Sequence, residues 1–315
     1  MTTKLQGNLF GDATPIDEHV NRNTVESHYQ RYWEKCQSQL SEGYVNTISY
    51  GGGRNSTAAA ILLAKEQASG GELIDGIVFA DTGAEKPETY DYIQVFDAWL
   101  RKEIGIGITL TRNFDKQNRF TTLVEECQYY GNMPSRAYGR GSCSANWKIS
   151  PLLKKSAELA KERGVVNVVA NIGIHYGEMS RLIGKNSQLK SLSRCAYGVT
   201  HWNRYPLIER KLNQAACVAI IQSVGLPMPP KSACYICPHS TVSDVNDLRI
   251  KHPALYEIAC SIEKVGMLVM RKKSYKGMGG RGKFSFQEVG NVTPLEQWAS
   301  EVKASNQSCN CIDDF

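Results

Sequence analysis

Long hydrophobic runs are absent from this 315-residue sequence. No apolar stretch approaches the roughly 18 residues that a membrane-spanning helix needs, so no membrane span is predicted. The first seven residues lack the basic and apolar regions of a secretory signal peptide. We therefore expect a cytoplasmic protein whose ten cysteines are ligands, nucleophiles or buried thiols, because disulfides are rare in that compartment.

Excess charge is also absent from most of the chain. The 37 basic residues exceed the 31 acidic ones by six, and six basic residues fall within 271–284, where no acidic residue occurs. Clustered charge on a glycine-rich backbone suits nucleotide or nucleic-acid phosphates, although a solvated loop would have the same composition. These residues are Arg271, Lys272, Lys273, Lys276, Arg281 and Lys283, and a second basic stretch with Arg136 and Arg140 would close over a phosphate as a lid.

Three consecutive glycines at 51–53 separate a β-type run over 44–50 from an alanine-rich run over 58–64. This order predicts a strand, a turn and a helix start, where backbone N–H groups and the helix dipole bind anions. We expect Ser56 and Thr57 to cap the helix and to offer hydroxyls to the same anion. A Walker loop and a dinucleotide fingerprint are both excluded by the residues that follow. The alternative is a tight turn that only joins two elements.

A second apolar run, over 74–80, is typical of a buried parallel strand and ends in a polar segment over 81–89. Strand, helix and strand from 45 to 80 form one unit, so both polar turns should lie at the same edge of the sheet. Open α/β folds bind their ligands at this edge. Apolar runs over 106–110 and 165–170 predict later strands of the same sheet.

Five segments in this order resemble those of the PP-loop superfamily and, within it, the phosphoadenosine phosphosulfate (PAPS) reductase family. They are the glycine turn with its flanks (49–58), the segment 79–85, a Cys-x4-Lys-x2-Pro-Leu segment (143–152), a Gly…Glu…Arg segment (173–181) and a Cys-x-x-Cys-Pro segment (234–238). The resemblance covers roughly residues 44–265. It implies an α/β fold with an open, mostly parallel sheet, helices on both faces and a smaller cysteine-bearing C-terminal region.

We expect three parts along the chain. They are a flexible N-terminal arm over 1–22, a nucleotide-binding α/β domain over 23–208, and a helical region over 209–315 with the cysteine pair, the basic loop and the tail. In the arm, Gln6, Leu9 and Phe10 fit the short peptide that binds bacterial sliding clamps, which would place the protein at DNA.

The resemblance also implies an adenine nucleotide, either ATP with Mg²⁺ or PAPS. Its phosphates would lie on the glycine turn and its adenosine on the segment 81–85. ATP-cleaving relatives usually have serine and aspartate where this chain has Gly51 and Asn55, and an amide holds Mg²⁺ less well than a carboxylate. The expected nucleotide-binding residues are Ser49, Tyr50, Gly51, Gly52, Gly53, Arg54, Asn55, Ser56, Asp81, Thr82, Gly83, Glu85 and Gly173.

Candidate catalytic residues come from the nucleotide site and from the tail. In relatives, a cysteine on a mobile C-terminal tail folds over the nucleotide and acts as the nucleophile; an inert tail is the alternative here. For the Gly…Glu…Arg segment the alternatives are a structural histidine and an internal ion pair. The candidates are Asn55, His175, Glu178, Arg181, Cys309 and Cys311.

The spacing Cys234-x-x-Cys237 suits ligands of zinc or of an iron–sulfur cluster, although a pair without metal would look the same. The resemblance implies Cys143 as a third ligand and favours a 4Fe–4S cluster over zinc. Cys195 is our candidate for the fourth ligand, with His239 in reserve.

The family resemblance implies an adenine-nucleotide-dependent sulfur-transfer enzyme that activates its substrate by adenylylation, converting ATP to AMP and pyrophosphate. The substrate would be DNA or RNA, the sulfur donor a cysteine desulfurase or a thioredoxin-like protein, and Lys148 would contact phosphate or nucleic acid. One alternative is a reductase of PAPS or a related sulfonucleotide. Another is a non-catalytic nucleotide- and DNA-binding accessory protein, which Asn55 in place of aspartate would explain.

Overall fold

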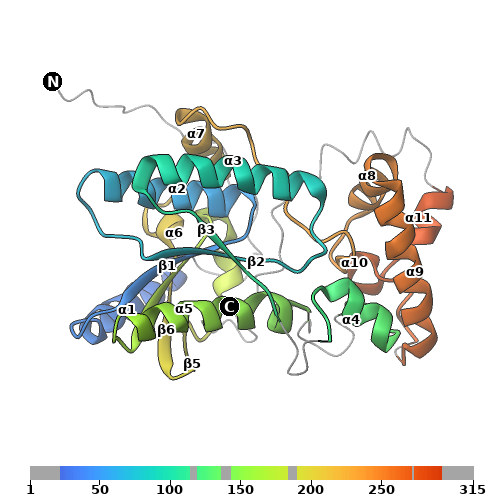
Figure 1. Cartoon of the computed structure of the whole chain (residues 1–315), viewed down its shortest axis with the longest axis horizontal. Helices are drawn as coiled ribbons and strands as arrows, with labels where there is room; N and C mark the ends of the chain where they lie inside the picture. The colour runs from blue at the N-terminus through green and yellow to red at the C-terminus, as the bar shows by residue number, and fades with distance from the viewer. Residues whose placement is uncertain (1–21, 114–118, 136–142, 184–189, 272, 293–315) are drawn as a thin grey trace. The chain divides into compact units, whose positions relative to one another are not determined.

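The computed structural model describes residues 22–113, 119–135, 143–183, 190–271 and 273–292 (Figure 1). Several predictions concern residues outside these ranges and stay predictions. They are the arm with Gln6, Leu9 and Phe10, the basic residues Arg136, Arg140 and Lys272, and the tail cysteines Cys309 and Cys311. No helix in the described ranges is long and apolar enough to cross a membrane.

A six-stranded sheet forms the centre of the fold, in the order β3-β2-β1-β4-β6-β5. Parallel pairing joins β1 to β4 and β4 to β6, and only the edge strand β5 pairs antiparallel among the ladders described. This confirms the predicted α/β class with a mostly parallel sheet. The strands are β1 (Val45–Tyr50), β2 (Gly76–Ala80), β3 (Ile108–Thr111), β4 (Asn167–Ile172), β5 (Ser193–Ala196) and β6 (Val199–Arg204).

Helices follow most strands, and the helix predicted to start after the glycine turn is α2. The helices are α1 (Arg22–Gln39), α2 (Arg54–Ala68), α3 (Pro87–Ile104), α4 (Leu123–Tyr130), α5 (Ser150–Glu162), α6 (Pro206–Glu209), α7 (Gln214–Ser223), α8 (Val242–Lys251), α9 (Pro253–Val269), α10 (Gly279–Gly282) and α11 (Phe286–Val292). A π-helical turn, η1 (Ser144–Ile149), and a 3-10 segment, η2 (Tyr176–Leu182), complete the described secondary structure.

The chain divides into two compact units, each made of separate stretches of sequence. Unit 1 comprises Met1–Val78, Val95–Ile108 and Ser156–Pro229. Unit 2 comprises Phe79–Gln94, Thr109–Lys155 and Pro230–Phe315. Each unit is described below by itself.

In unit 1, helices cover both faces of the parallel strands. Strands β1 and β4 are buried along their whole length, as central parallel strands are. On one face, α5 places Ala157 and Ala160 against Val45 and Val168, while α2 packs with α7 on the other (Figure 1). Small alanines let each helix approach the sheet closely, which explains the alanine-rich run after the glycine turn.

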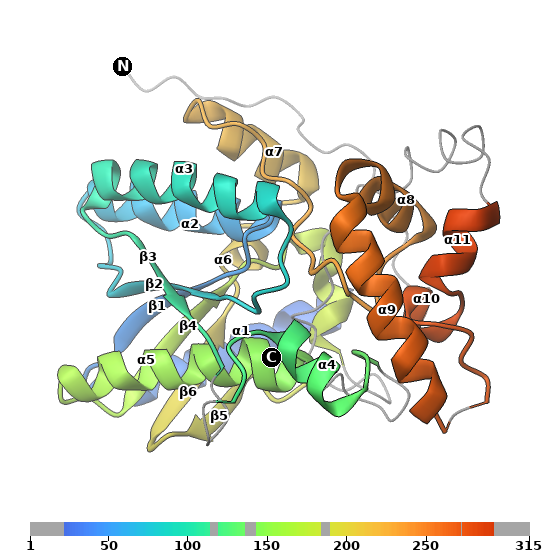
Figure 2. The same cartoon turned by 45° about the vertical axis from the view of Figure 1, so that its right-hand side comes forward.

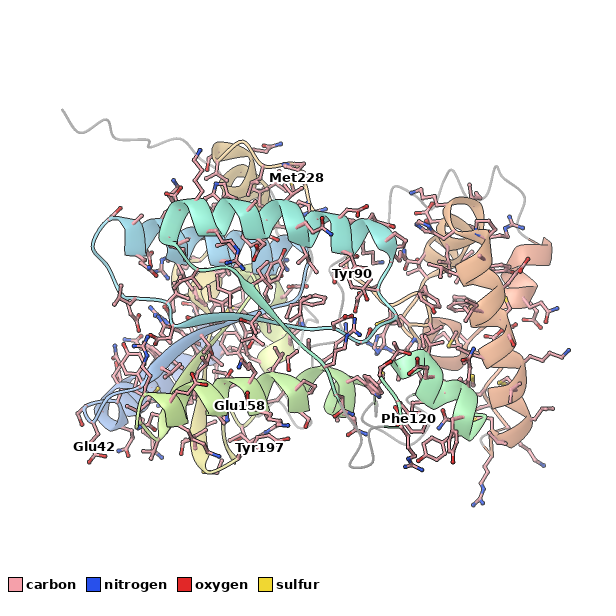
Figure 3. All side chains as sticks on the ribbon, in the orientation of Figure 1. Glu42, Tyr90, Phe120, Glu158, Tyr197 and Met228 are labelled. Atoms are coloured by element: carbon pink, nitrogen blue, oxygen red, sulfur yellow. The ribbon has the colours of Figure 1, made fainter. Side chains whose placement is uncertain are left out.

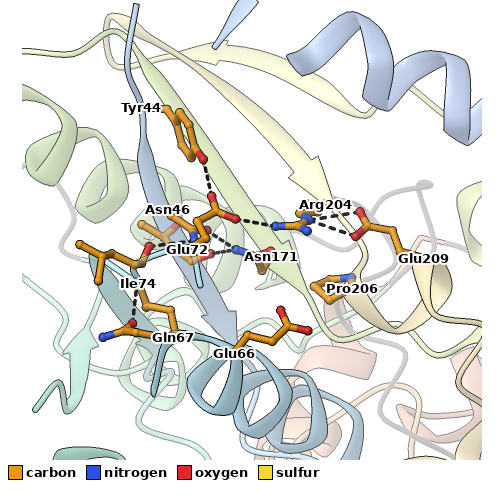
Figure 4. Close-up of polar contacts among 12 residues, drawn as sticks. Tyr44, Asn46, Glu66, Gln67, Glu72, Ile74, Asn171, Arg204, Pro206 and Glu209 are labelled. Carbon is orange, nitrogen blue, oxygen red and sulfur yellow. Dashed lines mark hydrogen bonds and ion pairs between the residues drawn. The ribbon is translucent and has the colours of Figure 1, made fainter. Parts of the chain in front are cut away.

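A polar network centred on Arg204, the last residue of β6, reaches the segments that precede β1 and β2 and the helix α6 (Figure 4). The Arg204 guanidinium donates through Nε to both oxygens of Glu209, at 3.2 and 3.1 Å, and through Nη1 to Glu72 Oε2 at 2.9 Å. The hydroxyl of Tyr44 also donates to Glu72. Because the Arg204 side chain is largely buried, these two carboxylates are what make its charge tolerable there.

His201 on β6 makes the stability of unit 1 depend on pH. It lies opposite Arg194 of β5 and is 2% exposed. Burial lowers the pKa of His201 from 6.5 to about 4, so below pH 6.5 the unfolded chain binds a proton that the folded protein does not. The free energy of unfolding should therefore fall by up to about 3 kcal/mol as the pH drops from 6.5 to 4.

Urea unfolding between pH 7.5 and 4, in the wild type and in His201→Gln, measures this contribution. The two proteins should differ in slope only below pH 6.5, with the wild type losing more stability. Parallel stability curves over that range would contradict the assignment to His201.

Candidate functional site

The glycine turn lies at the carboxyl end of β1, as predicted. Gly52 has φ of 72°, a left-handed conformation that glycine adopts without a steric penalty, and Gly53 precedes α2 as its N-cap. The predicted cap by Ser56 and Thr57 is wrong. Their hydroxyls donate to the carbonyl of Gly53, at 3.0 and 2.9 Å, because both residues lie inside the first turn of the helix.

Gly173 brings the end of β4 into backbone contact with the start of α2. A Cβ at Gly173 would lie 2.5 Å from the amide nitrogen and Cα of Ser56 and 2.7 Å from the carbonyl carbon of Asn55. Only glycine fits without a shift of backbone. The parallel register of β1 and β4 thus places the two predicted motifs, about 120 residues apart, at one sheet edge.

Glu178 is the centre of a polar cluster beside this contact. Its Oε2 accepts a hydrogen bond from Asn55 Nδ2 at 2.9 Å and from Arg181 Nη1 at 3.3 Å, and lies 3.7 Å from His175 Nε2. The structure therefore brings together the four candidate catalytic residues that lie in the described ranges. The ion pair considered as the alternative for Glu178 and Arg181 is present.

His175 has a defined tautomer in this cluster. The amide of Gly177 donates to His175 Nδ1 at 3.0 Å, so the neutral ring carries its proton on Nε2, which faces Glu178. Burial lowers the pKa of His175, and the Glu178 carboxylate opposes that shift. A neutral ring with a fixed Nε2–H is a hydrogen-bond donor to a bound anion or to Glu178.

The side-chain amide of Asn55 donates to the Glu178 carboxylate, which gives a physical reason for an amide rather than a carboxylate at position 55. We expect Asn55→Asp to place two carboxylates in contact and to lower the free energy of unfolding by roughly 1–3 kcal/mol at pH 8. Most of the loss should disappear at pH 5.5, because one carboxylate of a close pair keeps its proton there. Urea unfolding at both pH values measures the effect.

The double variant Asn55→Asp/Glu178→Gln is the control, since it restores one carboxylate and one amide in exchanged positions. It should be more stable than Asn55→Asp at pH 8. Equal destabilisation of both variants at both pH values would show that the contact is unimportant.

In unit 2, Asp81 fixes the polar segment that follows β2. The buried carboxylate accepts the Gly83 amide at 2.8 Å, the Tyr90 hydroxyl at 2.7 Å and Arg112 Nε at 2.8 Å. Tyr90, labelled in Figure 3, extends from the first turn of α3. All these partners are protein groups, so Asp81 holds the shape of the segment expected to bind adenosine.

Glu85 joins a lysine and a thiol in the same unit. Its Oε1 lies 3.3 Å from Lys148 Nζ and accepts from Cys234 Sγ at 3.3 Å, while Cys234 also contacts Thr82 Oγ1 at 3.1 Å. The other oxygen, Glu85 Oε2, is buried and has no hydrogen-bond partner among the residues that the structure describes. Burial is the largest single influence on Lys148 and disfavours its charge, but Glu85 and the nearby cysteines together outweigh it, and the pKa of Lys148 is raised. Lys148, expected at a phosphate, is thus paired inside the protein.

Residues 234–239, called the cysteine loop below, are held by hydrogen bonds from their own backbone amides. The amide of Cys237 donates to the carbonyl of Cys234 at 3.1 Å, and the amide of His239 donates to Cys237 Sγ at 3.4 Å. Burial raises the pKa of Cys237 to about 11 and that of Cys234 well above its usual range. Without an added cation, both thiols are therefore protonated at neutral pH.

The predicted metal ligands are distributed over both units. Cys143, Cys234 and Cys237 belong to the same apolar cluster of unit 2. Cys195 lies on β5 in unit 1, exposed, with Sγ 3.6 Å from Thr200 Oγ1, and His239 Nδ1 accepts from Arg281 Nε at 3.2 Å. Within the described ranges, no three histidine, cysteine, aspartate or glutamate side chains are arranged to hold a metal ion. The donor types suit a thiolate-bound metal, but their arrangement does not form its site.

The basic segment 271–284 is folded rather than a free loop. Gly280 and Arg281 donate their amides to the carbonyls of Ser240 and Pro238, at 3.0 and 2.7 Å, which docks the segment on the cysteine loop. Tyr275 and Met278 are buried. The five basic residues with described side chains are all exposed, namely Arg271, Lys273, Lys276, Arg281 and Lys283.

Glu263 anchors this segment and was not predicted as important. Its buried carboxylate accepts the amides of Met278 and Phe286, at 2.5 and 2.9 Å, and the hydroxyl of Ser285 at 2.6 Å. The sequence did contain a signal. Glu263 lies at helical spacing from Ala259 and Gly266 and beside Ile262, which are apolar positions of α9, and an acidic residue on the buried face of a helix needs donors.

These features define an α/β protein with polar clusters after the carboxyl ends of its parallel strands. It is similar in fold to PAPS reductase from Candida auris in its phosphate complex (TM-score 0.36, 14% identity, 70% of this chain and 92% of that chain). It is also similar to the U34-tRNA thiolase NcsA from Methanococcus maripaludis with its [4Fe-4S] cluster (TM-score 0.43, 16% identity, 79% of this chain and 82% of that chain).

Sequence comparison finds a match over a smaller part of the chain. An uncharacterized 37.8 kDa protein of Escherichia phage 186 is 30% identical over 94 residues, which are 28% of this chain and 27% of the phage protein. The match therefore spans about a quarter of that relative. No family model matches the chain.

Proposed function

We propose that this protein is an adenine-nucleotide-dependent sulfur-transfer enzyme. The observation that supports this best is the assembly in unit 1, where the glycine turn and the start of α2 meet Gly173 and the Glu178 cluster. Backbone amides and the positive end of α2 would bind phosphate oxygens. Arg181 and the Nε2–H of His175 would add charge and a directed donor near them.

The proposed reaction has two steps. An oxygen of the acceptor attacks the α-phosphorus of ATP, a new P–O bond forms, and pyrophosphate leaves. The terminal sulfur of a persulfide on an external donor then bonds to the acceptor carbon, the carbon–oxygen bond breaks, and AMP leaves. A second thiol, supplied by the donor or by a thiol reductant, cleaves the resulting acceptor–donor disulfide, which releases the thiolated acceptor and leaves the donor sulfur in a disulfide. The donor would be a cysteine desulfurase or thioredoxin-like protein, and the acceptor DNA or RNA. Mg²⁺ would neutralise the pyrophosphate, and Glu178, which accepts from Asn55 in the first turn of α2, is a carboxylate that would hold it.

The thiols of unit 2 are the second reason for assigning sulfur chemistry. Cys143, Cys234 and Cys237 belong to one apolar cluster. Glu85 contacts both Lys148 and the thiol of Cys234. In their described arrangement these three thiols do not form the site of a 4Fe–4S cluster or a zinc ion, so the proposed reaction assigns no step to such a group. An iron and zinc assay of protein purified without oxygen, with its absorbance spectrum, decides between these metals and none.

A second candidate function is reduction of PAPS or a related sulfonucleotide, with Cys309 or Cys311 as nucleophile. The folding of the basic segment next to the cysteine loop favours a substrate with an extra phosphate. A non-catalytic accessory protein is the third candidate, and the bond from Asn55 to Glu178 suits it equally.

Calorimetry with ATP and PAPS, followed by assay of AMP and pyrophosphate release, separates these functions. Sulfur transfer by adenylylation predicts ATP binding and release of both products when acceptor and donor are present. Tight PAPS binding with thiol-dependent release of sulfite would favour the reductase. Nucleotide binding without products under either condition would favour the accessory protein, and binding of neither nucleotide would end the proposal.

A further inference from the structure

Unit 2 carries a cluster of three aromatic rings around one arginine, outside the candidate site. The Phe120, Tyr129 and Tyr130 rings contact one another with centroids 5.0 to 5.5 Å apart. Arg119 lies over all three, 5.2 Å from the Phe120 centroid, 5.6 Å from Tyr129 and 5.9 Å from Tyr130, and donates to the Tyr130 hydroxyl at 3.0 Å. We name these four residues the aromatic platform; Phe120 is labelled in Figure 3.

The platform is unusually exposed for aromatic residues. Tyr129 is 65% and Tyr130 49% exposed, and the Arg119 side chain is exposed as well. Phe120 is buried and supports the other rings from below. Two adjacent, solvent-facing tyrosines leave ring faces open that the fold does not use, which in a folded protein indicates a binding surface.

The apolar surface continues from α4 onto the end of α9, which packs against it (Figure 2). Leu268 is 82%, Val269 59% and Val265 44% exposed there. A Cβ on Gly131, the residue after α4, would lie 3.3 Å from Val265 Cγ1, so the two helix ends touch. The platform and the end of α9 therefore form one surface.

Positively charged side chains come next in the chain after this surface. The chain leaves α9 at Val269 and continues into the basic segment, whose side chains Arg271 and Lys273 are exposed. Glu263 holds that segment in place. Of the acidic residues of α4, Glu126 accepts the Trp147 indole, and Glu125, which is exposed, has its carboxylate held by the capping box with Thr122.

We propose that this surface binds single-stranded DNA or RNA, with unpaired bases stacked on Tyr129 and Tyr130 and phosphates on the basic segment. Stacking on aromatic rings and on an arginine plane, beside a cationic track, is the arrangement that single strands require. An apolar protein partner would not need five exposed cations. A duplex would offer the cations its phosphates but would hide its bases from the rings. The proposal rests on the sulfur-transfer function proposed above. It adds that the group that accepts the sulfur is an unpaired nucleotide of the bound strand.

Fluorescence anisotropy with a labelled single strand of about 20 nucleotides, longer than one stacking site, tests the proposal. Tyr129→Ala and Tyr130→Ala should each weaken binding by about 10-fold or more, and the double variant by about 100-fold. Tyr129→Phe and Tyr130→Phe should bind like the wild type, because the ring is kept. Tyr197→Ala, at a 45% exposed tyrosine of unit 1, is the matched control and should change nothing.

The basic segment has a separate readout. Replacing Lys276 and Lys283 with glutamine should make the salt dependence of binding shallower, by about 0.7 in the log–log slope for each single-strand phosphate that the variant no longer neutralises. The wild type should also prefer the single strand to the matching duplex.

Three results would overturn the proposal. One is equal binding of single strand and duplex, and another is full affinity in the double tyrosine variant. The third is a change in self-association of that variant by sedimentation, with its nucleic-acid affinity intact, which would make the surface an interface between two copies of this chain. Calorimetry with ATP on the same variants keeps the two proposals apart. If the protein binds single strands but not ATP, the proposed function is wrong and the platform proposal stands. If it binds ATP but not single strands, the platform proposal is wrong and the proposed function stands.

Discussion

Replacing Gly173 with alanine is expected to abolish detectable nucleotide binding, with an affinity loss of at least about 100-fold. The new methyl group would lie 2.5 Å from the Ser56 amide nitrogen and 2.7 Å from the Asn55 carbonyl carbon. Both are backbone atoms, which cannot rotate away as a side chain does. The start of α2 must move, and the amides proposed to bind phosphate move with it. Titration calorimetry with ATP and with PAPS measures the loss.

Gly164→Ala provides the matched control. It lies in the turn between α5 and β4 with φ of 69°, and a Cβ there meets nothing within 4 Å. The substitution should cost about 1 kcal/mol of stability from backbone strain and leave nucleotide affinity unchanged. If Gly173→Ala folds and binds ATP or PAPS as tightly as Gly164→Ala does, the glycine turn is only a connection between β1 and α2.

The sequence predicted that the polar residues after β1 and after β4 lie together, because the direction of parallel strands fixes which of their ends meet. Strands of one direction end at one edge, so the polar residues after β1 and after β4 had to approach each other. The bond between Asn55 and Glu178 and the contact of Gly173 with Ser56 follow from that rule.

Pairings set by side-chain packing could not be predicted. Nothing in the sequence pairs Arg112 with Asp81, or Arg204 with both Glu72 and Glu209. The three aromatic rings of the platform lie within eleven residues, yet their exposure depends on α9, more than 120 residues later. The predicted cap at α2 failed for a local reason, since a glycine with no side chain occupies the N-cap position.

The basic segment is the clearest case of a composition that has two structural meanings. Its glycines and charges are equally typical of a solvated loop and of a shaped surface. What decides is Glu263, a single residue eight positions before the segment, together with Tyr275 and Met278 in the core. The backbone of the segment is held by buried contacts while its basic side chains remain exposed.

Glu263→Ala is therefore expected to lower the free energy of unfolding by roughly 3–5 kcal/mol, the scale for removing one partner of a buried charged network. The amides of Met278 and Phe286 and the hydroxyl of Ser285 would be left buried without an acceptor. Chemical denaturation measures the total loss. Hydrogen exchange of residues 273–286 shows where it arises, because their amides should exchange faster than those of unit 1.

Glu257→Ala, at an exposed glutamate on the same helix, is the control and should cost less than about 0.5 kcal/mol. Glu263→Gln should fall between the two, because its amide keeps one acceptor oxygen but places an NH₂ group against a backbone donor. The order of the three variants is decisive, because helix propensity alone would make both alanine variants slightly more stable. If Glu263→Ala unfolds like Glu257→Ala, the segment is held by Tyr275, Met278 and Phe286 without the carboxylate. If instead exchange increases only in 273–286 and single-strand affinity falls with it, Glu263 is the residue that gives the basic surface its shape.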